Sequence, residues 1–123
     1  MKISIKDNRK IFAIQKEFSS EFPFLKIQFF GKSNTKTGKS SIKIVKHSSK
    51  ELSDCRTQHN DGDIEITPEM SVVNLEENFR DVFGLHVEIL RKSGKAWLET
   101  SVTGNWSLKE QNAEGMALEN KAS

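Results

Sequence analysis

The sequence predicts an α+β domain, built as a tandem duplication of a β-α-β-β(-α) unit with a mostly antiparallel sheet and helices packed on one face. Apolar residues alternate in some segments and recur every three to four residues in others, which indicates strands and helices. The same apolar pattern returns 61 residues later. The 123 residues suit one domain. We expect it to span 1–118, with repeat one at about 2–57, repeat two at about 63–118 and a disordered tail at 119–123.

The duplication rests on apolar positions. The stretch "ISIKDNRKIFAIQKEFSSEFPFLKIQFF" from Ile3 aligns with "IEITPEMSVVNLEENFRDVFGLHVEIL" from Ile64, with one extra residue in the first copy. The polar positions differ, as expected if only the buried pattern is constrained. The matched pairs are Ile3/Ile64, Ile5/Ile66, Ile11/Val72, Ile14/Leu75, Phe18/Phe79, Phe22/Phe83, Leu25/Leu85, Ile27/Val87 and Phe29/Ile89.

Each copy is predicted to contain three strands. Alternating apolar residues are typical of half-buried strands, and the Ser93-Gly94 pair favours a tight hairpin turn. The predicted strands lie around Ile3 and Ile5, at Leu25–Phe29 and Ser41–Lys46 in the first copy, and around Ile64 and Ile66, at Leu85–Ile89 and Lys95–Thr100 in the second.

Each copy also contains one long helix, with apolar residues at 11, 14, 18 and 22 or at 72, 75, 79 and 83. For the first helix, Asp7 or Asn8 is the expected N-cap and Pro23 prevents continuation. For the second, Ser71 is the expected N-cap, Met70 is placed for a hydrophobic staple with Leu75, and Gly84 suits the end.

A further helix is predicted at the end of each copy, a short one in the first and the C-terminal helix in the second. Ser48 with Glu51, and Ser107 with Glu110, have the spacing of a capping box, in which each side chain binds a backbone N–H of the first turn. We therefore expect each copy to form its own three-stranded sheet with its long helix on one face.

The opposite sheet face is expected to be mixed in polarity. Its residues would be Lys26, Gln28, Phe30, Lys43 and Val45, then His86, Glu88, Leu90 and Trp97. Such a face is expected to be covered in part by the C-terminal helix with Trp106, Met116 and Leu118, by the other repeat, or by a second chain.

The strand–helix–strand–strand duplication over residues 2–100 resembles the gyrase-inhibitor-like effector-binding domains. This resemblance is one of topology and implies a ligand groove between the repeats. The stretches "FGLHVEILRKSGKAWLET" and "NWSLKEQN" are also similar to those of small uncharacterised bacterial proteins. The second resemblance implies no activity.

The stretch "GKSNTKTGKSS" at 31–41 ends like a phosphate-binding loop. That motif requires a first glycine at position 33, where Ser33 stands, and a helix after the loop. A strand pattern follows instead, so we interpret the stretch as a hairpin loop rather than a nucleotide site.

The segment 31–50 is strongly basic. Residues 1–50 carry twelve Lys or Arg and three acids, whereas residues 51–123 carry seven and fourteen. The segment suits either a solvated loop or a patch for an acidic partner. Nucleic-acid binding is the alternative, although base stacking would need more aromatic residues among the lysines. The candidate partner-binding residues are Lys32, Lys36, Lys39, Lys43, Lys46, Phe30, Val45, Leu90 and Trp97.

No catalytic, cofactor or metal site is predicted. Cys55 and His59 are four residues apart and could share a metal, but structural zinc needs four ligands. The same pair could act as a nucleophile and base, or mark only the end of a helix followed by a turn at 60–62. Glu76 and Glu77 are expected on the solvent side of their helix. Trp97 and Trp106 are expected in the core, or else as an interface or ligand platform.

These observations predict a small, non-enzymatic binding or interaction protein. Its partner would be another protein or a second copy of the chain, giving a monomer or homodimer, with the basic segment steering an acidic surface. The alternatives are nucleic-acid binding through 31–50 and small-ligand binding between the repeats. The single cysteine, the absence of an apolar N-terminal segment and the lack of a spanning run predict a cytoplasmic protein without membrane contact.

Overall fold

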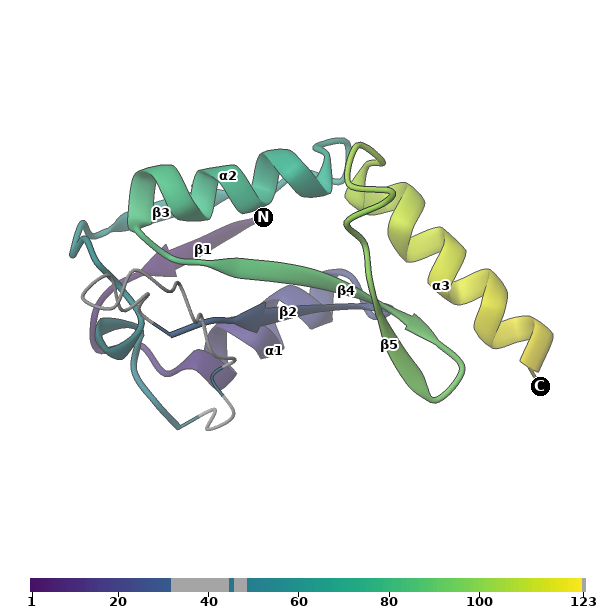
Figure 1. The fold of residues 1–123 in the computed structure, drawn as a ribbon, viewed down its shortest axis with the longest axis horizontal. Coiled ribbons are helices and arrows are strands. Elements are labelled where there is room, and N and C mark those ends of the chain that lie inside the picture. The colour runs from purple at the N-terminus through teal and green to yellow at the C-terminus, as the bar shows by residue number, and fades with distance from the viewer. Residues whose placement is uncertain (32–44, 46–48, 123) are drawn as a thin grey trace, which may run out of the picture.

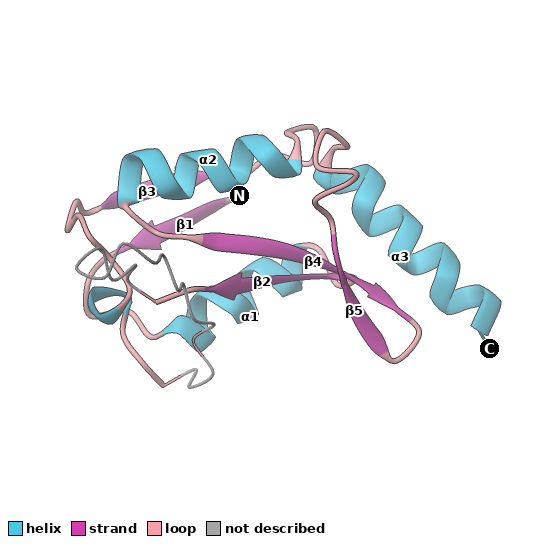
Figure 2. Ribbon diagram, in the orientation of Figure 1, coloured by secondary structure: helices cyan, strands magenta, loops and turns pink. Residues whose placement is uncertain are grey.

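The chain forms two antiparallel sheets and a set of helices around one core, as the computed structural model of residues 1–31, 45 and 49–122 shows (Figure 1). The elements are β1 (Lys2–Ile5), α1 (Ile11–Glu21), β2 (Leu25–Phe29), the 3-10 helix η2 (Leu52–Asp54), β3 (Gly62–Glu65), α2 (Val72–Phe83), β4 (Val87–Ser93), β5 (Ala96–Glu99) and α3 (Leu108–Ala122). This architecture confirms the predicted α+β class (Figure 2).

The strands pair between the two halves of the chain. β1 pairs with β3, and the order of the larger sheet is β2-β4-β5. The expectation that each half forms its own three-stranded sheet was therefore wrong. Strands β1 and β2, which α1 connects, lie in different sheets, and so do β3 and β4, which α2 connects.

The strand registers bring the aligned apolar positions together. Ile3 lies opposite Ile64 in the smaller sheet, and Ile27 lies opposite Ile89 in the larger one. Directly opposed residues place their side chains on the same face. Both pairs are buried in the single core cluster, together with the apolar stripes of α1 and α2. Phe29 of β2 meets Phe79 of α2 edge to face, with ring centroids 6.3 Å apart.

The second long helix ends as predicted at both termini. The Ser71 hydroxyl accepts the N–H of Asn74 at 3.1 Å, and Gly84 adopts a left-handed conformation with φ of 63°. Leu85 lies outside the strand, because its N–H donates to Phe79 O, and β4 begins at Val87.

The first long helix begins differently from the prediction. Its N-cap is Lys10, which makes no side-chain cap bond. Asp7 is unavailable for capping, because its two carboxylate oxygens bind Arg56 and His59. The helix ends at Glu21, two residues before Pro23.

The 3-10 helix η2 and the C-terminal helix α3 both begin with a capping box. In α3 the predicted pair is confirmed: Glu110 N donates to the Ser107 hydroxyl at 3.0 Å, and Ser107 N donates to the Glu110 carboxylate at 3.2 Å. In η2 the N-cap is Glu51 and the box is made by Glu51 and Asp54, whereas the predicted cap Ser48 lies outside the described residues. The N-cap therefore lies three residues later than predicted. Leu52 N donates to Arg9 O and attaches the start of this helix to the segment before α1.

In each half, equivalent backbone bonds attach the start of the later helix, η2 or α3, to the start of the earlier one, α1 or α2. Each bond in the first half has a counterpart in which one partner is shifted by 61 residues and the other by 56. The pairs are Ile11 N to Lys50 O and Val72 N to Trp106 O, Leu52 N to Arg9 O and Leu108 N to Met70 O, and Ser53 N to Asp7 O and Lys109 N to Pro68 O.

The mixed sheet face lies opposite the helices. Lys26, Gln28 and Glu88 alternate with the buried core residues of β2 and β4 and are partly exposed. Arg91 lies opposite Leu25, so its side chain is on the core face of the sheet. Helix α3 contacts Arg91 and therefore lies against the core face rather than the mixed face. Among the residues that the structure describes, no helix has the length and apolar character needed to cross a bilayer.

Candidate pocket at the open edge of β4

A surface pocket of about 270 Å³ opens beside the first residues of β4. It is lined by side chains from four places in the chain: the end of β2, helix α2, the start of β4 and the loop after β5. The lining residues are Phe30, Glu76, His86, Val87, Glu88 and Ser101.

The pocket exists because β5 pairs with only part of β4. Their register ends at Leu90 opposite Glu99, and the chain then turns away. The hydroxyl of the buried Thr100 donates to Ile89 O at 2.7 Å, which takes up one backbone group of the open edge. His86 O accepts the N–H of Phe30 from the opposite side. Because the bonding direction alternates along a strand, the N–H and C=O of Val87 point toward the open edge.

Glu76 is the central polar group of the pocket. Helix α2 brings its carboxylate to the strand edge, where it accepts a backbone hydrogen bond from Ile89. The pKa of Glu76 is raised from 4.5 to about 7, mainly by burial; the Ile89 bond opposes this shift and the nearby charge of Glu88 adds to it. Burial and the charge of Glu99 likewise raise the pKa of Glu88. The pocket therefore favours the neutral form of both carboxyl groups more than water does.

The pocket combines these acids with apolar surface. Phe30 and Val87 offer carbon contact area, and the His86 ring and the Ser101 hydroxyl add groups that can donate or accept hydrogen bonds. An apolar pocket with a few converging polar groups, one of them with a strongly shifted pKa, has the features of a ligand site.

Sequence analysis identified only one residue of this pocket as a candidate for binding. Phe30 lies in the lining, but Glu76 was expected on the solvent side together with Glu77, and only Glu77 is exposed. The available signal was helical spacing, since position 76 is four residues after Val72 and three before Phe79, at the margin of the apolar stripe.

The other predicted binding residues lie apart from the pocket. Leu90 is only 8% exposed, whereas Trp97 on β5 is 39% exposed. The Lys26 ammonium lies over the Trp97 ring, 5.8 Å from the ring centroid. Val45 is partly buried and donates its N–H to Phe29 O. The basic candidates Lys32, Lys36, Lys39, Lys43 and Lys46, the loop at 32–41 and the rest of the strand predicted at Ser41–Lys46 fall outside the described residues.

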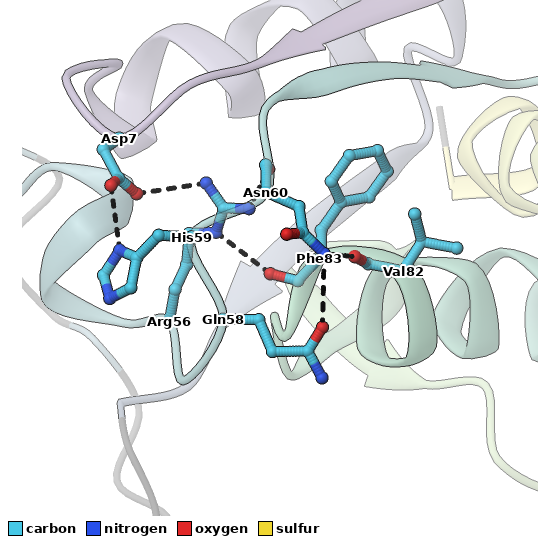
Figure 3. Close-up of polar contacts among 7 residues, drawn as sticks. All are labelled: Asp7, Arg56, Gln58, His59, Asn60, Val82 and Phe83. Atoms are coloured by element: carbon cyan, nitrogen blue, oxygen red, sulfur yellow. Dashed lines mark hydrogen bonds and ion pairs between the residues drawn. The ribbon is translucent and has the colours of Figure 1, made fainter.

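A second polar cluster joins the two halves of the chain (Figure 3). Arg56 is completely buried, and its guanidinium donates to Asp7 Oδ1 at 3.0 Å, to Phe83 O at 2.9 Å and to Asn60 O. His59 Nδ1 lies 2.8 Å from Asp7 Oδ2. The cluster connects the turn after β1, the segment before β3 and the end of α2.

This cluster includes His59, which the sequence paired with Cys55 as a candidate for metal binding or catalysis. Cys55 is buried, whereas His59 is exposed and directed to Asp7. Within the described ranges, no group of three or more Cys, His, Asp or Glu side chains is arranged to hold a metal ion. Sequence analysis missed Arg56, because its neighbours are mostly polar.

No family model, curated protein or solved structure matches this chain.

Proposed function

We propose that this chain is a non-enzymatic binding protein, and that the pocket at the open edge of β4 holds a small molecule carrying a protonated amine. The observation that carries the proposal is the Glu76 carboxyl, which lies in the pocket beside Glu88 and has its pKa raised to about 7. The ligand site expected between the two halves has a counterpart in this pocket, because Phe30 comes from the first half and the other lining residues come from the second.

Electrostatics favour a cationic head group. Two carboxyl groups in a partly buried pocket disfavour each other's ionisation, and a cation placed between them removes that cost. An ammonium group donates up to three hydrogen bonds, and charge-assisted bonds to carboxylates are stronger than neutral ones. A carboxylate or phosphate ligand would add to the negative charge instead.

The size and lining of the pocket favour a short ligand with an apolar body. Drug-sized ligands occupy pockets of roughly 300–1,000 Å³, so about 270 Å³ suits a smaller molecule. Phe30 and Val87 provide the apolar contact. A nucleotide would be too large and carries the wrong charge.

Ligand binding is tested with three probes that share an alkyl body: butylamine, butanol and butyric acid. Chemical-shift titration should give a dissociation constant of about 1 mM for butylamine at pH 8, and much weaker binding of the other two. Glu76→Gln should weaken butylamine binding about tenfold, because a charge-assisted bond becomes neutral. Glu77→Gln is the matched control, since it removes an exposed charge from the adjacent position of α2.

The pH dependence provides a second check. Between pH 6 and 8 the ionised fraction of a group with a pKa of about 7 rises from about a tenth to about nine tenths, while the amine stays protonated. Butylamine should therefore bind several-fold more tightly at pH 8 than at pH 6, and Glu76→Gln should reduce this dependence, with His86 of the lining left as the group whose charge can still change between these pH values. Equal binding of butanol, an equal loss in Glu77→Gln, or consumption of the amine over time would overturn the proposal.

We also propose that the two halves arose by duplication and that the protein acts in the cytoplasm. The three pairs of equivalent backbone bonds and the opposed pairs Ile3 with Ile64 and Ile27 with Ile89 support the duplication. The single cysteine supports the location. The nucleic-acid alternative stays a prediction, because most of the segment that carries it lies outside the described residues.

A further inference from the structure

Strand β5 is an exposed edge with an unusual composition. It is the last strand of the β2-β4-β5 sheet, and all four of its residues, Ala96–Glu99, are exposed. Trp97 is 39% exposed and Leu98 is 43% exposed. An exposed and largely apolar edge strand is a template for pairing with another strand, and natural proteins usually protect such edges.

The backbone groups of this edge are directed outward at alternate residues. The backbone groups of even-numbered residues along β4 form hydrogen bonds on the side of β2. His86 O accepts from Phe30 N, and Lys92 N donates to Phe24 O. Its odd-numbered residues Arg91 and Ser93 therefore bond to β5, where they lie opposite Leu98 and Ala96. The N–H and C=O groups of Trp97 and Glu99 consequently point away from the sheet.

The sequence of the edge is complementary to itself in the antiparallel direction. When "KAWLE" at 95–99 is placed against a second, reversed copy with Trp97 opposite Trp97, Lys95 falls opposite Glu99 at both ends. Lys95, Trp97 and Glu99 alternate with Ala96 and Leu98, so the charged pairs flank the aromatic pair on one face. Opposed charges and opposed aromatic residues both stabilise neighbouring strands.

We propose that β5 pairs with β5 of a second copy of this chain, which gives a two-fold symmetric homodimer with one continuous sheet. The same surface serves both partners, as a two-fold interface requires. The paired Lys95 and Glu99 fix the register, because sliding either strand by one residue separates the charges and turns the side chains to opposite faces.

The interface is small, so the dimer should be weak. A short strand pair buries much less than the roughly 1,200–2,000 Å² of a stable complex, and a dissociation constant of roughly 100 µM is expected. Sedimentation analysis of the full chain between about 10 µM and 1 mM covers this range.

Charge reversal tests the register. Lys95→Glu places Glu against Glu99 of the other copy, and Glu99→Lys places Lys against Lys95, so each variant should dimerise at least about tenfold more weakly. The double variant restores opposite charges and should return to within about threefold of the native value. All these positions are exposed, so circular dichroism should show an unchanged fold.

Mixing the two single variants gives the sharpest outcome. Lys95→Glu and Glu99→Lys should each be largely monomeric alone, yet their mixture should form a heterodimer, because both charged pairs are then attractive. The amides of Trp97 and Glu99 should gain hydrogen-exchange protection as the dimer forms. A native chain that is monomeric at 1 mM, single variants that dimerise normally, or a mixture that fails to associate would each overturn the proposal.

Discussion

At the scale of single residues, Arg56 stabilises the join between the two halves. Its guanidinium is fully buried, and its three nitrogen atoms have acceptors on Asp7, Phe83 and Asn60. Arg56→Met keeps much of the volume but leaves the Asp7 carboxylate with His59 as its remaining partner, and it leaves the carbonyls of Phe83 and Asn60 without their guanidinium donor. Removing one partner of a buried pair costs about 3–5 kcal/mol. Because Asp7 is partly exposed, we expect a loss of about 3 kcal/mol in the free energy of unfolding, measured with urea.

The exposed ion pair between Lys10 and Glu51 provides the comparison. Its nitrogen and oxygen atoms are 3.5 Å apart, and both side chains are more than 40% exposed. Such pairs contribute about 0.2–1 kcal/mol, so Lys10→Met should change the unfolding free energy by less than about 1 kcal/mol. Equal losses for Lys10→Met and Arg56→Met would show that burial of the guanidinium is not what makes Arg56 important.

The pocket around Glu76 and the cluster around Arg56 illustrate which residues a sequence pattern can identify. Apolar periodicity correctly assigned the core positions Phe18 and Phe79, because burial of apolar residues repeats with the period of the helix. Arg56 and Glu76 interrupt that rule. The Arg56 guanidinium is buried and the Glu76 carboxyl is partly buried. Each has a backbone partner on a distant segment, Phe83 for Arg56 and Ile89 for Glu76, and such partners are set by tertiary structure.

At the scale of elements, glycine at the end of α2 is required for two separate reasons. Gly84 has φ of 63°, and a Cβ there would lie 2.8 Å from the backbone nitrogen of Gln58. Gly94 in the β4–β5 turn has nearly the same φ, 61°, but a Cβ there meets nothing within 4 Å. Left-handed backbone costs an L-residue about 1–2 kcal/mol. We expect Gly94→Ala to lose about 1 kcal/mol, and Gly84→Ala to lose at least about 1 kcal/mol more because the backbone must move.

Urea unfolding of the two glycine variants measures this difference. Their shared left-handed conformation cancels in the comparison, so the remainder reports the close contact between Gly84 and Gln58. If both variants lost the same stability, that contact would have no energetic role.

Local signals explain why helix ends were predicted better in the second half than in the first. Ser71, Gly84 and the Ser107–Glu110 pair act through neighbours within a few residues, and all were confirmed. The first helix was expected to begin with an Asp7 or Asn8 cap. Asp7 instead binds Arg56, forty-nine residues away, and this competition is invisible to a rule about local sequence.

At the scale of the whole molecule, the halves are interleaved rather than stacked. β1 pairs with β3 and β2 pairs with β4, so both sheets need strands from both halves (Figure 1). The alternation of apolar residues predicted which side of each strand is buried but carried no information about its neighbour. Any of several pairings would bury the same faces, so the pattern alone does not select the observed one.

Interleaved sheets should unfold as one cooperative unit, which native-state hydrogen exchange can test. Gln28 in the first half lies opposite Glu88 in the second, and Ile89 is buried beside them opposite Ile27. Ile89→Val should destabilise the protein by about 1 kcal/mol through loss of a buried methyl group. Because the strands share one sheet, the exchange free energies of the Gln28 and Glu88 amides should fall by the same amount. Halves that unfolded independently would lower the value for Glu88 alone, and Ile27→Val would then lower the value for Gln28 alone.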